Sequence, residues 1–360
     1  MTESLLVVVA AGATPDITPE TMVAGLPLGR RLALAGARAG LASAPSSEPG
    51  RRRLILVPSN VIPQPRWLRA LAAMPLQPET LWMDPAQVAV VDTDDPKPVL
   101  DAAGRAASAA ECVAALKGRF ATIEGMADHR GRFVVRTAGD LRRAESWLLR
   151  GLIKDSEGFM SRHVERLISL ALTRHLVWTS VTPNAMSLVS LAIGLAAAPF
   201  FLSSAPGRQL TGALLFLLHS ILDGCDGEIA RLKFLESPGG AALDFWGDNS
   251  VHVAVFGCMA VGWSLSAHSA WPMVVGAVAL AGTLAAAFVV APHMVSTSAT
   301  AGPRSVGAKT ADALANRDFI YLIVALSAFG KAAWFIVFVA IGTPIFVLVR
   351  VWVDRPHGSA

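Results

Sequence analysis

Residues 221–231 read Ile-Leu-Asp-Gly-Cys-Asp-Gly-Glu-Ile-Ala-Arg, and residues 240–248 read Gly-Ala-Ala-Leu-Asp-Phe-Trp-Gly-Asp. Each stretch overlaps an apolar segment long enough to cross a bilayer, near 209–230 and 242–266. The aspartates are spaced by three residues in the first stretch and by four in the second, so each pair lies on one face of a helix. The two stretches follow one another closely in the chain, which indicates two adjacent antiparallel helices that hold four carboxylates near one membrane surface. Charges within membrane segments are costly and usually functional, so these carboxylates are candidate site residues.

Charge is distributed unevenly along the 360 residues. The chain is 53% hydrophobic and 16% charged, with a mean hydropathy of +0.50, whereas soluble domains carry about 25% charged residues. This composition excludes a disordered chain, a collagen-like repeat and a disulfide-rich secreted scaffold. Residues 1–156 hold 35 charged side chains and residues 157–360 only 23, which predicts a cytoplasmic α/β domain followed by an all-α membrane domain.

Strands and helices alternate in the first part. Strands are expected at Leu5–Val9, Leu54–Pro58, Val88–Asp92 and Phe133–Arg136, and helices at Arg31–Leu41 and Ala102–Leu116. This alternation favours an α/β domain with a largely parallel sheet. The acidic group Asp92, Asp94 and Asp95 is either a solvated loop or a metal site.

Six membrane spans are predicted in the second part, forming a six-helix bundle near 184–204, 209–230, 242–266, 269–292, 317–331 and 332–353. Before them, residues 159–178 space apolar side chains and arginines at helical intervals. This pattern predicts a juxtamembrane amphipathic helix on the membrane surface, with a linker helix packed on the soluble domain as the alternative.

Lysines and arginines divide unequally between the two sides of this bundle. Ten fall on the side of the termini, and only Arg208 and Lys331 fall opposite. The positive-inside rule therefore places both termini and the aspartates at the cytoplasmic face of the inner membrane, in agreement with an N-terminus that shows no signal peptide.

The four aspartates Asp223, Asp226, Asp244 and Asp248 would repel one another unless cations neutralised them. Oxygen ligands favour Mg²⁺ or Mn²⁺, and two such ions about 3.5–4 Å apart form a clamp for phosphoryl displacement. A structural polar group and an ion pathway are the alternatives. Because the carboxylates gather at one face instead of forming a ladder through the spans, a transporter is the second choice.

The pattern formed by these positions resembles the signature of the CDP-alcohol phosphotransferases, also called CDP-alcohol phosphatidyltransferases. Its positions in this chain are Asp223, Asp226, Gly227, Ala230, Arg231, Gly240, Asp244 and Asp248, and Thr182-Pro183-Asn184 matches a further family element. The resemblance implies a membrane enzyme of phospholipid or polyol-phosphodiester synthesis. It would transfer a substituted phosphate from a CDP-linked donor to an alcohol and release CMP, using two Mg²⁺ or Mn²⁺ ions, as a homodimer in the bilayer. A nucleic-acid partner is not expected.

The resemblance also implies a role for each matched residue. Asp223, Asp226 and Asp244 would ligate the metals, while Asp248 would complete the second metal site and act as general base. Arg231 would neutralise phosphate or orient an aspartate. The CDP moiety would be bound by Asn184, Asp223, Asp226, Gly227, Ala230, Arg231 and Gly240.

Some candidate residues keep two interpretations. Asn184 is either near the nucleotide or a helix N-cap. Arg304 and Lys309 either bind a phosphate on the acceptor or are topology charges. His219 and His252, near the aspartates, are either groups that pack behind and support the metal ligands or metal ligands themselves.

Residues 1–156 resemble a sugar-nucleotidyltransferase domain, through the first strand, residues 23–31 and residues 37–40. Residues 13–20 lack the glycine series and the arginine that would hold a triphosphate, so we expect this domain not to perform nucleotidyl transfer.

The order of the two parts is similar to that of the bifunctional inositol-1-phosphate cytidylyltransferase/di-myo-inositol-phosphate-phosphate synthases, in which the soluble half makes the CDP-polyol. A bifunctional enzyme is therefore the alternative. The membrane half alone is equally similar to the phosphatidylinositol-phosphate synthases, which join CDP-diacylglycerol to a phosphorylated inositol.

Overall fold

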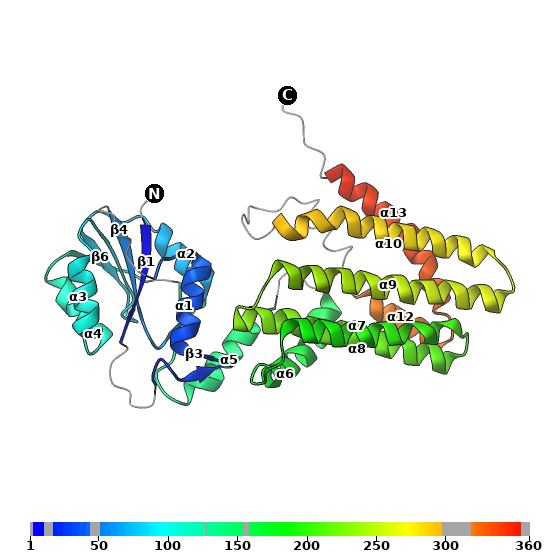
Figure 1. Ribbon diagram of the computed structural model, residues 1–360, viewed down its shortest axis with the longest axis horizontal. Coiled ribbons are helices and arrows are strands. Elements are labelled where there is room, and N and C mark those ends of the chain that lie inside the picture. Colours follow the sequence, from blue (N-terminus) through cyan, green and yellow to red (C-terminus); the bar gives the residue numbers. More distant parts are fainter. Residues whose placement is uncertain are drawn as a thin grey trace, which may run out of the picture. The chain divides into compact units, whose positions relative to one another are not determined.

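The computed structural model divides the chain into two compact units, Met1–Arg150 and Gly151–Ala360 (Figure 1). The predicted domain boundary at 156 falls in residues 154–157, outside the described part of the chain. The structure describes residues 3–10, 17–43, 51–126, 128–153, 158–296 and 318–353.

A five-stranded sheet forms the centre of the first unit. Its strands, in spatial order, are β1 (Glu3–Val9), β4 (Arg52–Pro58), β7 (Ala89–Thr93), β6 (Thr80–Met83) and β8 (Ala121–Glu124). The outer pairs β1/β4 and β6/β8 are parallel, but β7 runs antiparallel to both of its neighbours. The other four strands therefore all run in one direction, so the expectation of a largely parallel sheet is confirmed, with β7 as the exception. The connection from Met83 to Ala89 is too short for the crossover that parallel neighbours need, so the two strands form a hairpin.

Helices cover both faces of this sheet, with α1 and α2 on one side and α3 and α4 on the other (Figure 1). The helices of this unit are α1 (Leu28–Ala39), α2 (Pro65–Ala73), α3 (Lys97–Arg105), α4 (Ala109–Lys117) and α5 (Asp140–Arg150). The helix predicted over 102–116 is thus two helices. Ser108 caps the second by accepting the Glu111 N–H at 3.2 Å, and Glu111 accepts the Ala107 N–H at 2.8 Å, one residue before the N–H that a capping box uses.

Two short ribbons complete the first unit. β2 (Met22–Val23) pairs with β3 (Leu26–Pro27), and β5 (Val61–Pro63) pairs with β9 (Arg132–Val134). The last predicted strand, over 133–136, therefore joins β5 and not the central sheet.

The second unit is helical. Its elements are η2 (Ser161–Glu165), α6 (Arg166–Leu176), α7 (Pro183–Ala197), η3 (Ala198–Leu202), α8 (Pro206–Lys233), α9 (Pro238–Ala267), α10 (Trp271–Ser296), α12 (Phe319–Ala328) and α13 (Ala333–Val353). A helix occupies each of the six positions predicted as spans.

Four segments of these helices are long and apolar enough to cross a membrane: Pro183–Leu202, Pro238–Ala267, Trp271–Ala291 and Ala333–Trp352. α12 has only 10 residues, and α8, with 28, is not among the four because its C-terminal half is rich in charged side chains. By length and composition the structure therefore supports four of the six predicted spans.

Small residues bring α7, α8 and α9 close together near their polar side chains. Gly194 on α7 is the tightest point, since a methyl group there would lie 2.7 Å from Val251 on α9 and 2.9 Å from His219 on α8. Phe201, Phe216 and Val255 fill the apolar core beyond this crossing. The three helices thus pack as a unit on which the candidate site is built.

Candidate functional site

Three carboxylates meet where α8 ends and α9 begins. One oxygen each of Asp223, Asp226 and Asp244 lies within 4.8 Å of the others, and the first two side chains are buried. The connection between the helices is short: Phe234 takes a left-handed conformation after α8, and Ser237 caps α9 by accepting the Gly240 N–H at 3.0 Å. This tight turn sets the acidic faces side by side, as the spacing predicted.

The first helix of the bundle adds a hydroxyl to this acidic group. Ser187 on α7 donates a short hydrogen bond to Oδ2 of Asp226 and is itself buried. Ser187 was not predicted from the sequence. Its signal is modest: it lies three residues after Asn184, and therefore on the same face of α7.

Asp248 is not a member of the group of three among the described residues. One turn further along α9, its Oδ1 lies 3.2 Å from Nε2 of His219 on α8, and its side chain is 16% exposed. The other ring nitrogen of His219 lies 2.9 Å from the backbone oxygen of Ser190. Asp248 thus contacts a histidine that is not part of the group formed by the other three aspartates.

The residues expected to bind the CDP moiety line the same end of these helices. A Cβ atom added to Gly240 would lie 3.1 Å from Oδ1 of Asn184. A Cβ atom added to Gly227 would lie 3.3 Å from a guanidinium nitrogen of Arg231. Side chains at Gly240 or Gly227 would therefore crowd these polar groups, while Ala230 adds only a methyl group. Asn184 is not the N-cap of α7, because Thr182 accepts the Ala185 N–H at 3.3 Å.

The two residues expected to hold an acceptor phosphate, Arg304 and Lys309, lie outside the described residues. Their role stays a prediction.

A second polar cluster joins α8 to the predicted amphipathic helix. The fully buried Glu228 accepts hydrogen bonds from Arg166 at 2.6 Å, Ser169 at 2.7 Å and Thr173 at 2.6 Å, all on α6. The opposite side of this helix exposes Leu167 and other apolar side chains. The polar stripe of α6 therefore faces protein and its apolar stripe faces outward, the reverse of a helix in water.

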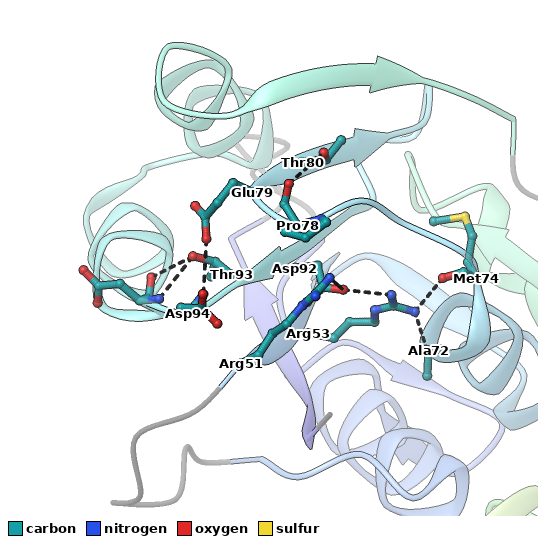
Figure 2. Close-up of polar contacts among 11 residues, drawn as sticks. Arg51, Arg53, Ala72, Met74, Pro78, Glu79, Thr80, Asp92, Thr93 and Asp94 are labelled. Atoms are coloured by element: carbon teal, nitrogen blue, oxygen red, sulfur yellow. Dashed lines mark hydrogen bonds and ion pairs between the residues drawn. The ribbon is translucent and has the colours of Figure 1, made fainter. Parts of the chain in front are cut away.

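In the first unit, Asp92 of the predicted acidic group forms a structural ion pair (Figure 2). Arg51 and Arg53 donate hydrogen bonds to the buried carboxylate of Asp92 at 2.8–3.1 Å. Burial works to raise the pKa of Asp92, but the two guanidinium groups outweigh it and hold the pKa below its usual value. Asp94 and Asp95 are exposed and do not join Asp92 in a set of metal ligands among the described residues.

The group on α8 and α9 suits a hard divalent cation. It offers carboxylate oxygens only, two of its members are buried, and like charges at this separation repel unless a cation lies between them. Mg²⁺ and Mn²⁺ prefer such ligands. The residues present therefore fit the metal that the sequence predicted.

Known proteins share this region. The bifunctional IPC transferase and DIPP synthase of Rubrobacter xylanophilus is 36% identical over 155 residues, which are 42% of this chain and 34% of the relative. Its counterpart from Thermococcus kodakarensis is 40% identical over 111 residues, 31% of this chain and 24% of the relative. The chain thus spans about a third or less of the length of these relatives.

Among solved structures, the phosphatidylinositol phosphate synthase of Mycobacterium tuberculosis, crystallised with manganese and citrate, has 18% identity and a TM-score of 0.37. That comparison covers 53% of this chain and 92% of the other. Residues 180–353 match the family model of CDP-alcohol phosphatidyltransferases, and this range contains all four aspartates and Arg231. The family that residues 180–353 match is the one that the sequence pattern predicted.

Proposed function

We propose that the second unit is a CDP-alcohol phosphotransferase that transfers a substituted phosphate from a CDP-linked donor to an alcohol and releases CMP. The observation that carries this proposal is the convergence of Asp223, Asp226 and Asp244 at one end of α8 and α9, within the matched family domain. A transporter would need polar groups through the depth of the bundle, whereas this acidic group is gathered at one end.

Asp223, Asp226 and Asp244 would hold Mg²⁺ or Mn²⁺, with Asp248 completing a second site. A bound divalent cation would neutralise the charge of the donor diphosphate and of the leaving phosphate. Gly227, Ala230 and Gly240 leave room for the CDP moiety beside Asn184 and Arg231. Arg231 adds a fixed positive charge next to that space.

Asp248 would act as general base. In the proposed reaction, the acceptor hydroxyl oxygen forms a bond to the β-phosphorus of the donor, and its proton passes to the Asp248 carboxylate. The bond from the β-phosphorus to the bridging oxygen breaks, and CMP leaves with that oxygen. The partial exposure of Asp248, unlike the burial of Asp223 and Asp226, supports this role.

Donor and acceptor are proposed by class. The donor is of the CDP-diacylglycerol or CDP-inositol type, and the acceptor is an alcohol such as an inositol phosphate, with Arg304 and Lys309 on its phosphate. The names of the relatives and of the solved structure support these classes.

The chain is a multi-pass membrane protein, and we place both termini and the active site on the cytoplasmic side of the inner membrane. The excess of Lys and Arg on the side of the termini supports this orientation. The outward apolar stripe of α6 supports its location at the membrane surface. A homodimer is proposed from the family resemblance.

The deciding experiment measures CMP release by the full chain in nanodiscs, with Mg²⁺ or Mn²⁺, from CDP-diacylglycerol and CDP-inositol against a panel of alcohols. Metal-dependent release by wild type, lost in Asp248→Asn, is the expected result. Equal rates in the two proteins, or no release from any donor, would overturn the proposal.

A second activity is tested on the same preparation. The relatives are named as bifunctional, but residues 13–20 depart from a phosphate-binding loop, so we propose that the first unit does not make the CDP-alcohol. Pyrophosphate release from CTP with a sugar-alcohol phosphate would instead support the bifunctional alternative.

A further inference from the structure

One histidine ring joins three helices beside the site. His219 on α8 places Nδ1 2.9 Å from the backbone oxygen of Ser190 on α7 and Nε2 3.2 Å from Oδ1 of Asp248 on α9. The His219 side chain is 3% exposed. The ring therefore lies between two hydrogen-bond acceptors inside the protein.

The contact with Ser190 fixes how the ring faces. A backbone carbonyl oxygen can only accept, so Nδ1 donates its hydrogen to Ser190. The Asp248 carboxylate also only accepts, so Nε2 holds Oδ1 by a hydrogen bond when it carries a hydrogen as well. Phe216 stacks on the ring with 6.0 Å between centroids and an interplanar angle of 14°. Gly194 of α7 also lies against the ring, since even a methyl group there would lie 2.9 Å from it. The ring is therefore closely packed between its neighbours.

We propose that His219 is a positioning residue for Asp248. The chain from Ser190 through the imidazole holds Oδ1 of the carboxylate, and so sets the orientation of the group that would take the acceptor proton. This inference rests on the proposed function, in which Asp248 is the base. It assigns His219 no contact with the substrate or with the three carboxylates of Asp223, Asp226 and Asp244.

The chain offers a matched control one turn from Asp248. His252 on α9 lies among aromatic rings, with centroids 5.6 Å from Phe216, 5.7 Å from Phe256 and 5.8 Å from Phe319. Its surroundings are those of a packing residue, so His252→Phe should leave turnover unchanged.

Two substitutions separate positioning from packing. The amide nitrogen of glutamine can stand where Nε2 of histidine stood, whereas asparagine reaches only the place of Nδ1. His219→Gln should therefore keep turnover within about 5-fold of wild type. His219→Asn should lower kcat by about 10–100-fold, the effect usual for partners that orient active-site ligands. The KM for the donor should stay within about twofold in both variants, because His219 is assigned no contact with the donor.

Equal losses in the glutamine and asparagine variants would overturn the proposal, and so would a rise in the donor KM as large as the fall in kcat. A wild-type protein that releases no CMP would instead refute the proposed function. In that case, coupling between His219 and Asp248 is measured from the melting temperatures of His219→Asn, Asp248→Asn and the double variant in metal-free buffer. Non-additive shifts are expected, and additive shifts would show that the two side chains are not coupled.

Discussion

Ser187 on α7 donates its hydroxyl hydrogen to Asp226 on α8, and so ties the first helix of the bundle to the acidic group. Hydrogen bonds of this kind orient a metal-ligating carboxylate, and their loss weakens metal binding. We expect Ser187→Ala to lower both Mn²⁺ affinity and CMP release by about 10-fold, measured by calorimetry and by turnover.

The control for this variant is Ser250→Ala. Ser250 is an exposed serine of α9 whose hydroxyl donates to the Trp246 backbone oxygen at 2.8 Å, away from the three carboxylates. Its replacement should change neither quantity. If Ser187→Ala behaved in the same way, the hydroxyl would have no part in holding the ligand.

The acidic group was predictable because it depends on local geometry. Spacings of three and four place carboxylates on one helix face, and a short turn between two helices brings the faces together. Ser187 was not predicted as a partner, and the role of His219 was left open between alternatives, because both roles depend on the rotation of one helix against another. The sequence pattern does not fix that rotation. The buried hydrogen bonds of Glu228 were not predicted for the same reason. Glu228 is a variable position of the motif, and its partners are known only once α6 is placed against α8.

In the first unit, the sequence pattern predicted the positions of strands better than it predicted which strands pair. The buried strands over 5–9 and 54–58 were expected, and both are present as parts of β1 and β4. The direction of β7 depends on which strand it pairs with, and only the short link to β6 reveals it. The helix break before Ser108 was visible in principle, since Ser108 and Glu111 have the spacing of a capping box.

The carboxylates that would bind the metal should destabilise the metal-free protein. Asp223, Asp226 and Asp244 lie within 4.8 Å of one another, so neutralising one of them removes repulsion. Asp244→Asn should raise the melting temperature in EDTA and abolish the stabilisation by Mn²⁺. For wild type that stabilisation is about 2.7 kcal/mol at 100 times the Kd. A variant that melts below wild type in EDTA, with the exposed Asp101→Asn unchanged, would contradict this account.

The link between α6 and α8 should be a major source of stability in the second unit. Glu228 is fully buried and satisfied by Arg166, Ser169 and Thr173, so replacing one of its oxygens with an amide group leaves a donor facing donors. Breaking a buried, charged hydrogen-bond network from one side costs about 3–5 kcal/mol. Glu228→Gln should lower the melting temperature in detergent, and the exposed Glu236→Gln should not. Similar melting temperatures for the two variants would show that this network adds little.

The ion pair of Asp92 with Arg51 and Arg53 should make the first unit sensitive to acid. The pKa of Asp92 is below its usual value of 3.8 in the folded chain, so its ionised form stabilises the fold above that pH, and this contribution is lost as the pH falls through the lowered folded value. Asp92→Asn should therefore weaken hydrogen-exchange protection of β4 and β7 at pH 7 by about 1.5–3 kcal/mol. The difference from wild type should shrink below pH 3.8, the usual pKa. The exposed Asp94→Asn serves as control, and a difference that stayed constant down to acid pH would show that charge is not its source.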